Sequence, residues 1–220
     1  MPHTAQVGRI SAAEAGAHHW DGVYAHRGER GVSWFAQHPT VALALLEAAG
    51  VDREQPVLDV GAGASRLVDE LLVRGYSDVT ALDVSDEGLA VSRARLGAAA
   101  DQVRWVVTDL LGWTPERRVA LWHDRAVFHF LTDPAARARY RAVCDAALAP
   151  DGVLVIATFA EDGPQACSGL PTARYSPEQL LDTLGGADRW IELARRREDH
   201  TTPSDVLQRF TWLALRRRTA

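Results

Sequence analysis

The sequence predicts a single doubly wound α/β domain with about seven strands. Between Pro56 and residue 159, short apolar runs alternate with segments whose apolar residues recur at helical spacing. Apolar runs of this kind are typical of parallel strands that helices cover on both faces. After residue 160 this rhythm stops, and two later segments alternate apolar with polar residues, as strands with one solvated face do.

The N-terminal part precedes this alternation. Residues 1–10 carry no regular pattern and are expected to be loose. A helix is predicted over residues 11–24, a glycine-broken loop over 27–31, and a buried helix over 33–50 that ends at Gly50. We therefore expect an N-terminal helical cap segment, residues 1–50, and a sheet domain that binds the ligand, residues 51–220, as parts of one domain overall.

Five strands and three helices are predicted within the alternating region. The helices occupy residues 64–74, 86–96 and 133–148, and Ser85 and Asp133 stand where N-cap side chains accept hydrogen bonds from the first free amides. The strands are expected at residues 57–60, 79–84, 103–107, 119–122 and 153–159.

The C-terminal part begins with a long segment, residues 161–175, that is rich in glycine and proline. A connection of this length without structure of its own is usually functional, so we expect it to form a wall or lid of a pocket. A helix follows over residues 176–184. Two strands are predicted at 190–196 and 207–216, which brings the total to about seven.

The composition excludes some chemistry. The chain has no lysine, and all 24 basic residues are arginine. A Walker P-loop and a pyridoxal Schiff base both need lysine, so both are excluded. The net charge of −5 makes nucleic-acid binding unlikely as a general function. Two cysteines without metal spacing, no long apolar run and no signal-peptide pattern predict a cytoplasmic protein with no membrane partner.

The strongest motif spans residues 57–65, VLDVGAGAS, after the first predicted strand and before the first helix of the alternation. The glycines allow a tight turn and a close approach of a ligand to the backbone. A dinucleotide fingerprint needs glycine at position 66, where Arg66 stands. Asp59 would also repel a pyrophosphate, whereas it suits a positively charged group such as an ammonium. An NAD-dependent oxidoreductase is therefore disfavoured.

Two more acids follow the next two strands. Asp83 lies 20 residues after Gly63, where a carboxylate binds ribose hydroxyls in nucleotide-binding folds. Asp109 follows the third strand and is placed to close the adenine end. Three acids at three successive strand ends, together with the glycine loop, predict a nucleotide-type site.

With these motifs, the chain from about residue 20 to 216 resembles a class I S-adenosylmethionine (SAM)-dependent methyltransferase. The resemblance implies a Rossmann-like, mostly parallel seven-stranded sheet with an antiparallel last strand, and S-adenosylhomocysteine (SAH) as the product of the cofactor. It also implies roles for the motif residues: the methionine part against the loop of Gly61, Ala62 and Gly63, the ammonium near Asp59, the ribose at Asp83, and the adenine at Val84, Asp109 and Leu110.

Two features resemble different branches of that family. Ser65 and the aromatic residues Trp20, Tyr24 and Trp34 are similar to the elongation-factor lysine methyltransferases, in which such aromatics close over the cofactor. Residues 122–127, WHDRAV, instead resemble thiopurine methyltransferase and its small-molecule relatives, in which the arginine lies near the acceptor. The two signals leave the branch open.

The candidate catalytic residues are His123, Asp124, Arg125 and His129, because they follow the fourth strand at the edge where ligands of open α/β sheets bind. Methyl transfer from a sulfonium depends mostly on positioning, and a general base is needed only if the acceptor must lose a proton. The competing interpretation is structural: hydrogen-bonded buried histidines, and an arginine paired with Asp124, with Asp133 or with a backbone carbonyl.

Other segments offer further candidates for the acceptor pocket, each with a structural alternative: His26, Cys167, Tyr175 and His200. No metal site is expected. We expect the protein to be a SAM-dependent methyltransferase that transfers a methyl group to N, O or S of a small-molecule acceptor. A protein-lysine methyltransferase and a non-catalytic SAM-binding partner protein are the alternatives.

Overall fold

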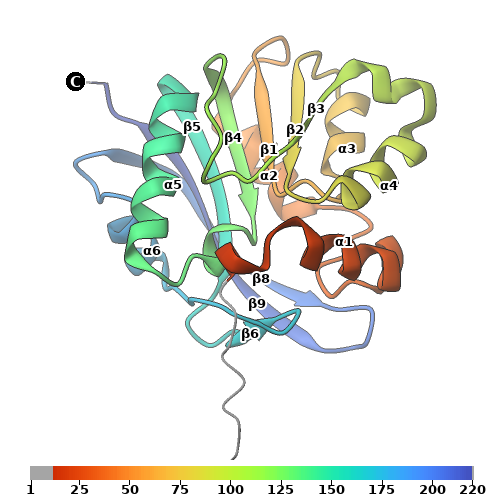
Figure 1. The fold of residues 1–220 in the computed structure, drawn as a ribbon. Coiled ribbons are helices and arrows are strands. Elements are labelled where there is room, and N and C mark those ends of the chain that lie inside the picture. Colours follow the sequence, from red (N-terminus) through yellow and green to blue (C-terminus); the bar gives the residue numbers. More distant parts are fainter. Residues whose placement is uncertain (1–11, 220) are drawn as a thin grey trace, which may run out of the picture.

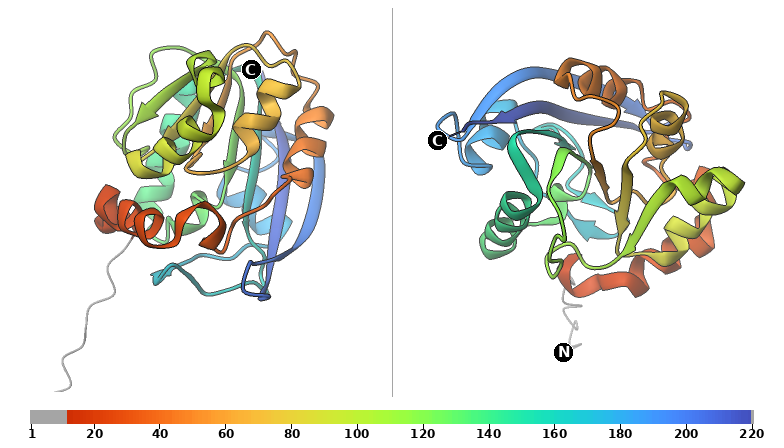
Figure 2. Two further views of the ribbon diagram at one scale, coloured as in Figure 1. Left: turned by 90° about the vertical axis from the view of Figure 1, so that its right-hand side faces the viewer. Right: turned by 90° about the horizontal axis from the view of Figure 1, so that it is seen from above.

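The computed structural model describes residues 12–219 and shows one seven-stranded sheet between two layers of helices (Figures 1 and 2). The strand order is β3-β2-β1-β4-β5-β9-β8. Only β9 runs antiparallel to its neighbours, so the other six strands are parallel to one another. The predicted fold class is thereby confirmed, including the antiparallel last strand.

The strands of this sheet agree with the predicted runs, with longer ends in the C-terminal half. Their bounds are β1 Val57–Val60, β2 Val79–Asp83, β3 Val103–Val107, β4 Val119–Arg125, β5 Leu148–Phe159, β8 Trp190–Thr201 and β9 Leu207–Arg217. The central strands are buried on both faces, as their continuous apolar sequences require.

Two hydrophobic clusters, one on each face of the sheet, hold the helical layers. Helices α2, α3 and α4 contribute to one cluster, and α5 and α6 contribute to the other. The bounds are α2 Thr40–Ala49, α3 Leu67–Val73, α4 Asp86–Leu96, α5 Pro134–Ala147 and α6 Pro177–Thr183. Ser85 and Asp133 are the N-caps of α4 and α5, and each accepts a hydrogen bond from the amide three residues later, as predicted.

Helix α1 (Ala12–Gly31) crosses below the arrowheads of the central strands in Figure 1. The predicted loop at residues 27–31 is wrong, because helical turns continue to Gly31. Gly28, with φ 61° and ψ −177°, only breaks the helix into two segments, as Gly16 does near its start. The expectation for residues 1–10 lies outside the described residues.

The helix predicted over residues 33–50 starts late, at Thr40. Pro39 disfavours a helical conformation of the residue before it, so the helix begins after this proline. The segment before it is irregular and directs Trp34 toward the sheet edge, where this side chain lines a cavity.

Strand β4 extends three residues beyond its predicted end. His123 and Asp124 therefore lie inside the sheet, and their Cα partners on β1 are Asp59 and Val60. The long 161–175 segment contains a small hairpin of two-residue strands, β6 Ala166–Cys167 and β7 Leu170–Pro171.

Candidate cofactor and acceptor site

A cavity of about 420 Å³ lies at the carboxyl ends of β1, β2 and β4. One end is lined by the residues that follow β2 and β3, and the other by residues that follow β4 together with side chains of β5, β6 and β9. We call these the carboxylate end and the aromatic end. The carboxylate end comprises Leu82–Val84 and Thr108–Leu111. The aromatic end comprises Arg125–Val127, His129–Leu131, Phe159, Cys167, Gln208 and Phe210.

Asp83 is the buried acid of the carboxylate end. Its Oδ1 accepts a hydrogen bond of 2.8 Å from the Ser85 amide, and burial raises the pKa of this carboxyl to about 6. Asp109 lies at the same end but is exposed, and its Oδ1 accepts a bond of 3.0 Å from the Leu111 amide. Val84 and the buried Leu110 supply apolar surface between these acids. The structure thus brings together the four residues predicted for the ribose and adenine.

The glycine loop after β1 is shaped by this chain's own side chains. Gly61 and Gly63 have positive φ, +67° and +43°. A Cβ at Gly61 would lie 2.2 Å from Val127 Cγ2, and one at Gly63 would lie 2.0 Å from Tyr24 Oη. The loop therefore needs glycine for its backbone conformation and for close packing against Val127 and Tyr24.

Asp59 lies beside this cavity, in a smaller hollow of about 50 Å³ that Ala62 also lines. Its Oδ1 accepts a hydrogen bond of 2.7 Å from His123 Nδ1, since the two residues face each other across β1 and β4. Its Oδ2 is buried and has no hydrogen-bond partner within residues 12–219. An unpartnered carboxylate oxygen of this kind fits an ammonium group.

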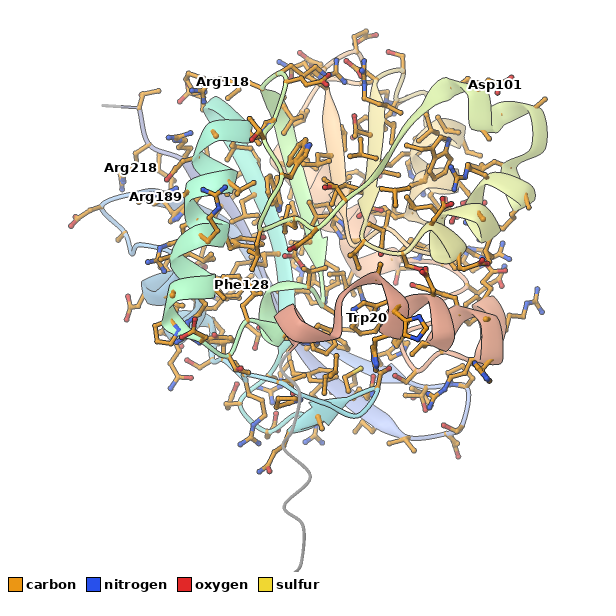
Figure 3. The ribbon with its side chains drawn as sticks, viewed as in Figure 1. Trp20, Asp101, Arg118, Phe128, Arg189 and Arg218 are labelled. Atoms are coloured by element: carbon orange, nitrogen blue, oxygen red, sulfur yellow. The ribbon has the colours of Figure 1, made fainter. Side chains whose placement is uncertain are left out.

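The predicted aromatics Trp20, Tyr24 and Trp34 all line the cavity and lie close together. The Trp20 ring is 5.9 Å from that of Trp34, and the Tyr24 ring is 6.0 Å from it. Figure 3 shows Trp20 on α1, at the edge of the sheet toward which β4 points. Helix α1 is attached to the start of α4 by a hydrogen bond of 2.6 Å from Ser85 Oγ to Asp21 Oδ1.

Ser65, on which the comparison with lysine methyltransferases depended, has a local structural contact. Its Oγ accepts a hydrogen bond of 3.1 Å from the Leu67 amide at the start of α3. A serine that accepts a bond from a first-turn amide stabilises a helix N-terminus in any α/β protein. Its presence does not favour either branch.

Asp124 does not line the cavity. The side chain is fully buried, and its Oδ1 accepts bonds from the amides of Val127 (2.9 Å) and Phe128 (3.4 Å). Its Oδ2 accepts a bond of 2.7 Å from the Tyr140 hydroxyl. Burial raises the pKa of this carboxyl to about 6. The carboxylate thus fixes the turn that follows β4, in which Ala126 adopts a left-handed conformation with φ 75°.

Arg125 lies between the two cavities and lines both. Its Nη1 donates a hydrogen bond of 3.0 Å to the Trp34 carbonyl, and its Nη2 is 3.8 Å from Glu198 Oε1. The guanidinium also covers the ring of Phe210 at 4.6 Å from the ring centre. The sequence offered Asp124, Asp133 or a backbone carbonyl as the partner of Arg125, and the structure shows a backbone carbonyl.

His129 lines the aromatic end of the cavity and is fully buried. Its Nδ1 lies 3.2 Å from the backbone nitrogen of Phe159. Burial, followed by the nearby charge of Arg125, lowers the pKa of this ring to about 3. His129 is therefore neutral at physiological pH. By contrast, His123 lines only the smaller hollow.

Of the four other residues predicted for the acceptor pocket, one lines the cavity and three do not. Cys167 lines the aromatic end, so the 161–175 segment supplies part of the cavity wall. His26 is exposed on α1, Tyr175 is packed in the core, and His200 lies 2.8 Å from the Ser33 carbonyl, so none of the three lines the cavity. Among the described residues, no three His, Cys, Asp or Glu side chains are grouped to hold a metal ion.

Phe159, Gln208 and Phe210 are among the lining residues that sequence reasoning did not single out. They belong to β5 and β9, which pair antiparallel with Phe159 opposite Phe210. The predicted strands contained Phe159, Gln208 and Phe210, but only the pairing register shows that they meet at the cavity.

None of the helices in the described part of the chain has the length and apolar character to span a membrane.

Residues 57–152 match the sequence model of a family described as a methyltransferase domain. No curated protein matches the chain in sequence.

Solved structures resemble nearly the whole chain. One, described by the conversion of a disulfide bond into a thioacetal group during echinomycin biosynthesis, is 24% identical, with TM-score 0.71 and 92% of each chain covered. The N-methyltransferase NodS from Bradyrhizobium japonicum WM9, in complex with SAH, is 15% identical, with TM-score 0.69 and coverage of 90% and 98%. The 1,6-didemethyltoxoflavin-N1-methyltransferase from Burkholderia thailandensis is 24% identical, with TM-score 0.66 and coverage of 92% and 84%.

These comparisons agree with the predicted fold class. They do not distinguish the two branches that the sequence resembles. Residues 57–152 match a methyltransferase-domain model in sequence, and residues 12–219 share their fold with solved methyltransferases such as NodS.

Proposed function

We propose that this protein is a SAM-dependent methyltransferase that methylates N, O or S of a small molecule. The observation that carries the proposal is the single cavity that joins the carboxylate end, with Asp83 and Asp109, to the aromatic end around His129 and Phe210. One end has the groups that a nucleoside needs, and the other offers apolar surface with few polar groups, as small-molecule sites do.

The residues present fit the cofactor. Asp83 is placed to accept hydrogen bonds from ribose hydroxyls, and Val84 and Leu110 are placed to pack on the adenine. The unpartnered Oδ2 of Asp59 would receive the ammonium group. Trp34 lines both the cavity and the hollow that contains Asp59, so the two spaces adjoin along this side chain.

The sulfonium of the cofactor supplies an activated methyl group, so this chain has to bind, orient and exclude water rather than form a nucleophile. Trp20, Tyr24 and Trp34 cover the site, and the turn fixed by Asp124 holds the residues that face the acceptor. Correct orientation of two reactants accounts for a large part of the rate enhancement of such a transfer.

SAH binding, measured by calorimetry, tests the proposal. The Asp83→Asn variant should bind SAH at least about tenfold more weakly, because a hydrogen bond to a charged group is lost. The control is Asp101→Asn, an exposed residue that Figure 3 places at a far corner of the molecule, and it should bind as the unmodified protein does. Absence of SAH binding to the unmodified protein at millimolar concentration would refute the proposal.

The acceptor class is tested with labelled SAM and a cell lysate. The proposal predicts that the label enters the small-molecule fraction, whereas a discrete labelled protein band supports the protein-lysine alternative. The chain itself contains no lysine, so a band at its own mass cannot arise from methylation of its lysine side chains. Cofactor binding without transfer to any fraction supports a non-catalytic partner protein instead.

A further inference from the structure

The hydrogen bond at His129 determines which of its ring nitrogens carries the hydrogen. The backbone N–H of Phe159 can only donate, and it donates to Nδ1 at 3.2 Å. The lone pair of the neutral imidazole is therefore on Nδ1, and the hydrogen is on Nε2. His123 shows the opposite arrangement, because its Nδ1 must donate to the carboxylate of Asp59.

The Nε2–H of His129 is a buried donor without an acceptor. Nε2 belongs to a ring that lines the cavity, and it has no hydrogen-bond partner in the part of the chain that the structure describes. Buried polar groups in folded proteins are almost always hydrogen-bonded. Because the ring borders the cavity, a ligand bound there can supply the acceptor atom once it reaches this nitrogen.

Aromatic side chains surround this donor. The His129 ring lies 4.4 Å from the ring of Phe159 and 4.5 Å from that of Phe130, and it is stacked on Phe210 at 6.5 Å. Phe159 and Phe210 are themselves 4.9 Å apart. Flat rings that border a cavity favour a flat ring as the occupant, through stacked or edge-to-face contacts.

The charged side chain at this end, Arg125, is positive, and its ion-pair partner Glu198, 3.8 Å from Nη2, lines the smaller hollow instead. Among the described side chains that line the cavity, the charged groups are Asp83 and Asp109 at the carboxylate end and Arg125 at the aromatic end. Arg125 lies over Phe210, and it is one cause of the lowered pKa of His129. The same charge opposes a cationic acceptor and favours a neutral or anionic one.

We propose that the aromatic end binds a flat ring compound that carries a carbonyl oxygen and is neutral or anionic, and that His129 Nε2–H donates a hydrogen bond to this oxygen. This inference rests on the proposed function and names its acceptor class. In the transfer, the acceptor heteroatom forms the bond to the methyl carbon, and the carbon–sulfur bond breaks with its electron pair on sulfur. A proton on the heteroatom is released to water, and His129 keeps its hydrogen throughout.

The tautomer is tested by NMR, without any ligand. Two-bond nitrogen–proton correlations of protein labelled with ¹⁵N-histidine distinguish Nδ1–H, Nε2–H and charged rings. We expect Nε2–H for His129 and a hydrogen on Nδ1 for His123 at neutral pH, with His129→Phe used to assign the signal. A His129 that carries its hydrogen on Nδ1, or that is charged at neutral pH, contradicts the proposal whether or not the protein binds SAH.

The acceptor class is tested by binding to SAH-saturated protein. Four probes differ in flatness, in the carbonyl group and in charge. Chromone is flat with a carbonyl, naphthalene is flat without one, 1-decalone has a carbonyl but is not flat, and N-methylquinolinium is flat and cationic. Chromone should bind at least about fivefold more tightly than each of the others, a ratio typical of one net hydrogen bond.

The His129→Phe variant should lose the preference for chromone over naphthalene and keep its SAH affinity. His38→Phe, at an exposed histidine before α2, is the matched control and should keep both. Equal binding of chromone and naphthalene to the unmodified protein, or an unchanged ratio in His129→Phe, overturns the proposal. A failure of SAH binding itself would instead count against the proposed function.

Discussion

The two ends of the cavity are built in different ways. The carboxylate end comes from one continuous part of the chain, in which β2 and β3 succeed one another, with Asp83 at the end of β2 and Asp109 after β3. The aromatic end combines residues of β4, β5, β6 and β9, from Arg125 to Phe210. The methyltransferase-domain match ends at residue 152, so Phe159, Cys167, Gln208 and Phe210 lie outside it.

This difference suggests that the two ends of the cavity have separate functions. The end that would hold the cofactor uses charged groups fixed at strand ends, which a short sequence motif encodes. The end that would hold the acceptor uses rings from strands far apart in the sequence. Variants that affect one end and spare the other therefore test the division.

The largest effect is expected at Gly63. In Gly63→Ala, the new Cβ meets the Tyr24 hydroxyl at 2.0 Å and the backbone keeps a positive φ. Overpacking and left-handed strain together should lower the free energy of unfolding by about 2–4 kcal/mol. SAH binding should be lost as well, as measured beside urea unfolding.

Gly97→Ala is the matched control for this loop. Gly97 also has a positive φ, +56°, but its Cβ would have no neighbour within 4 Å. Its cost should be the backbone strain alone, about 1–3 kcal/mol, with SAH binding unchanged. Equal losses in the two variants would mean that the contact with Tyr24 is unimportant.

The next effect is expected at Asp124. Asn at this position cannot accept bonds from both the backbone amides and the Tyr140 hydroxyl, so one buried donor loses its partner. We expect a loss of about 1–3 kcal/mol in unfolding free energy, with SAH affinity within about threefold of the unmodified protein. Loss of SAH binding in a folded Asp124→Asn protein would show that the two ends are not separable.

Asp124 also predicts a pH dependence. Its pKa in the folded state, about 6, lies above the usual 3.8 because of burial. The associated stability is fully present below about pH 4 and is lost as pH rises through about 6, in total about 2–3 kcal/mol. The difference in unfolding free energy between the unmodified protein and Asp124→Asn should therefore be larger at pH 4.5 than at pH 7.5. The reverse trend would contradict the raised pKa.

A smaller effect is expected at helix α1, which carries Trp20 and Tyr24 beside the cavity. Asp21→Ala removes the bond from Ser85 Oγ that attaches α1 to α4. We expect a loss of about 1 kcal/mol in unfolding free energy, and faster hydrogen exchange of α1 amides. SAH should also dissociate faster than from His18→Ala, an exposed position on the same helix. Identical exchange of α1 in the two variants would show that this bond does not hold the helix in place.

The smallest effect is expected at Cys167, in the wall of the aromatic end. Cys167→Ala shortens a buried side chain by one atom and should cost about 1 kcal/mol or less. Calorimetry should give an unchanged SAH affinity, because the side chain lies at the end away from Asp83. A marked loss of SAH affinity would place this wall in contact with the cofactor.

The sequence predicted the sheet, the caps at Ser85 and Asp133 and the carboxylate end, because each depends on residues close together in the chain. It misplaced the ends of α1 and β4. A glycine such as Gly28 interrupts a helix without ending it, and the burial of His123 depends on neighbouring strands. Phe159 and Phe210 were not identified as site residues for the same reason: only the pairing of β5 with β9 brings them together.

Arg125 belongs to the aromatic end and lines both the cavity and the smaller hollow that contains Asp59. Its guanidinium donates a hydrogen bond to the Trp34 carbonyl and covers the ring of Phe210. If the proposed cofactor and acceptor both contact this side chain, it couples their binding free energies, and such coupling is reciprocal. Binding of the first ligand, by fixing Arg125, would prepare the site for the second, and a change at this residue would alter both affinities together.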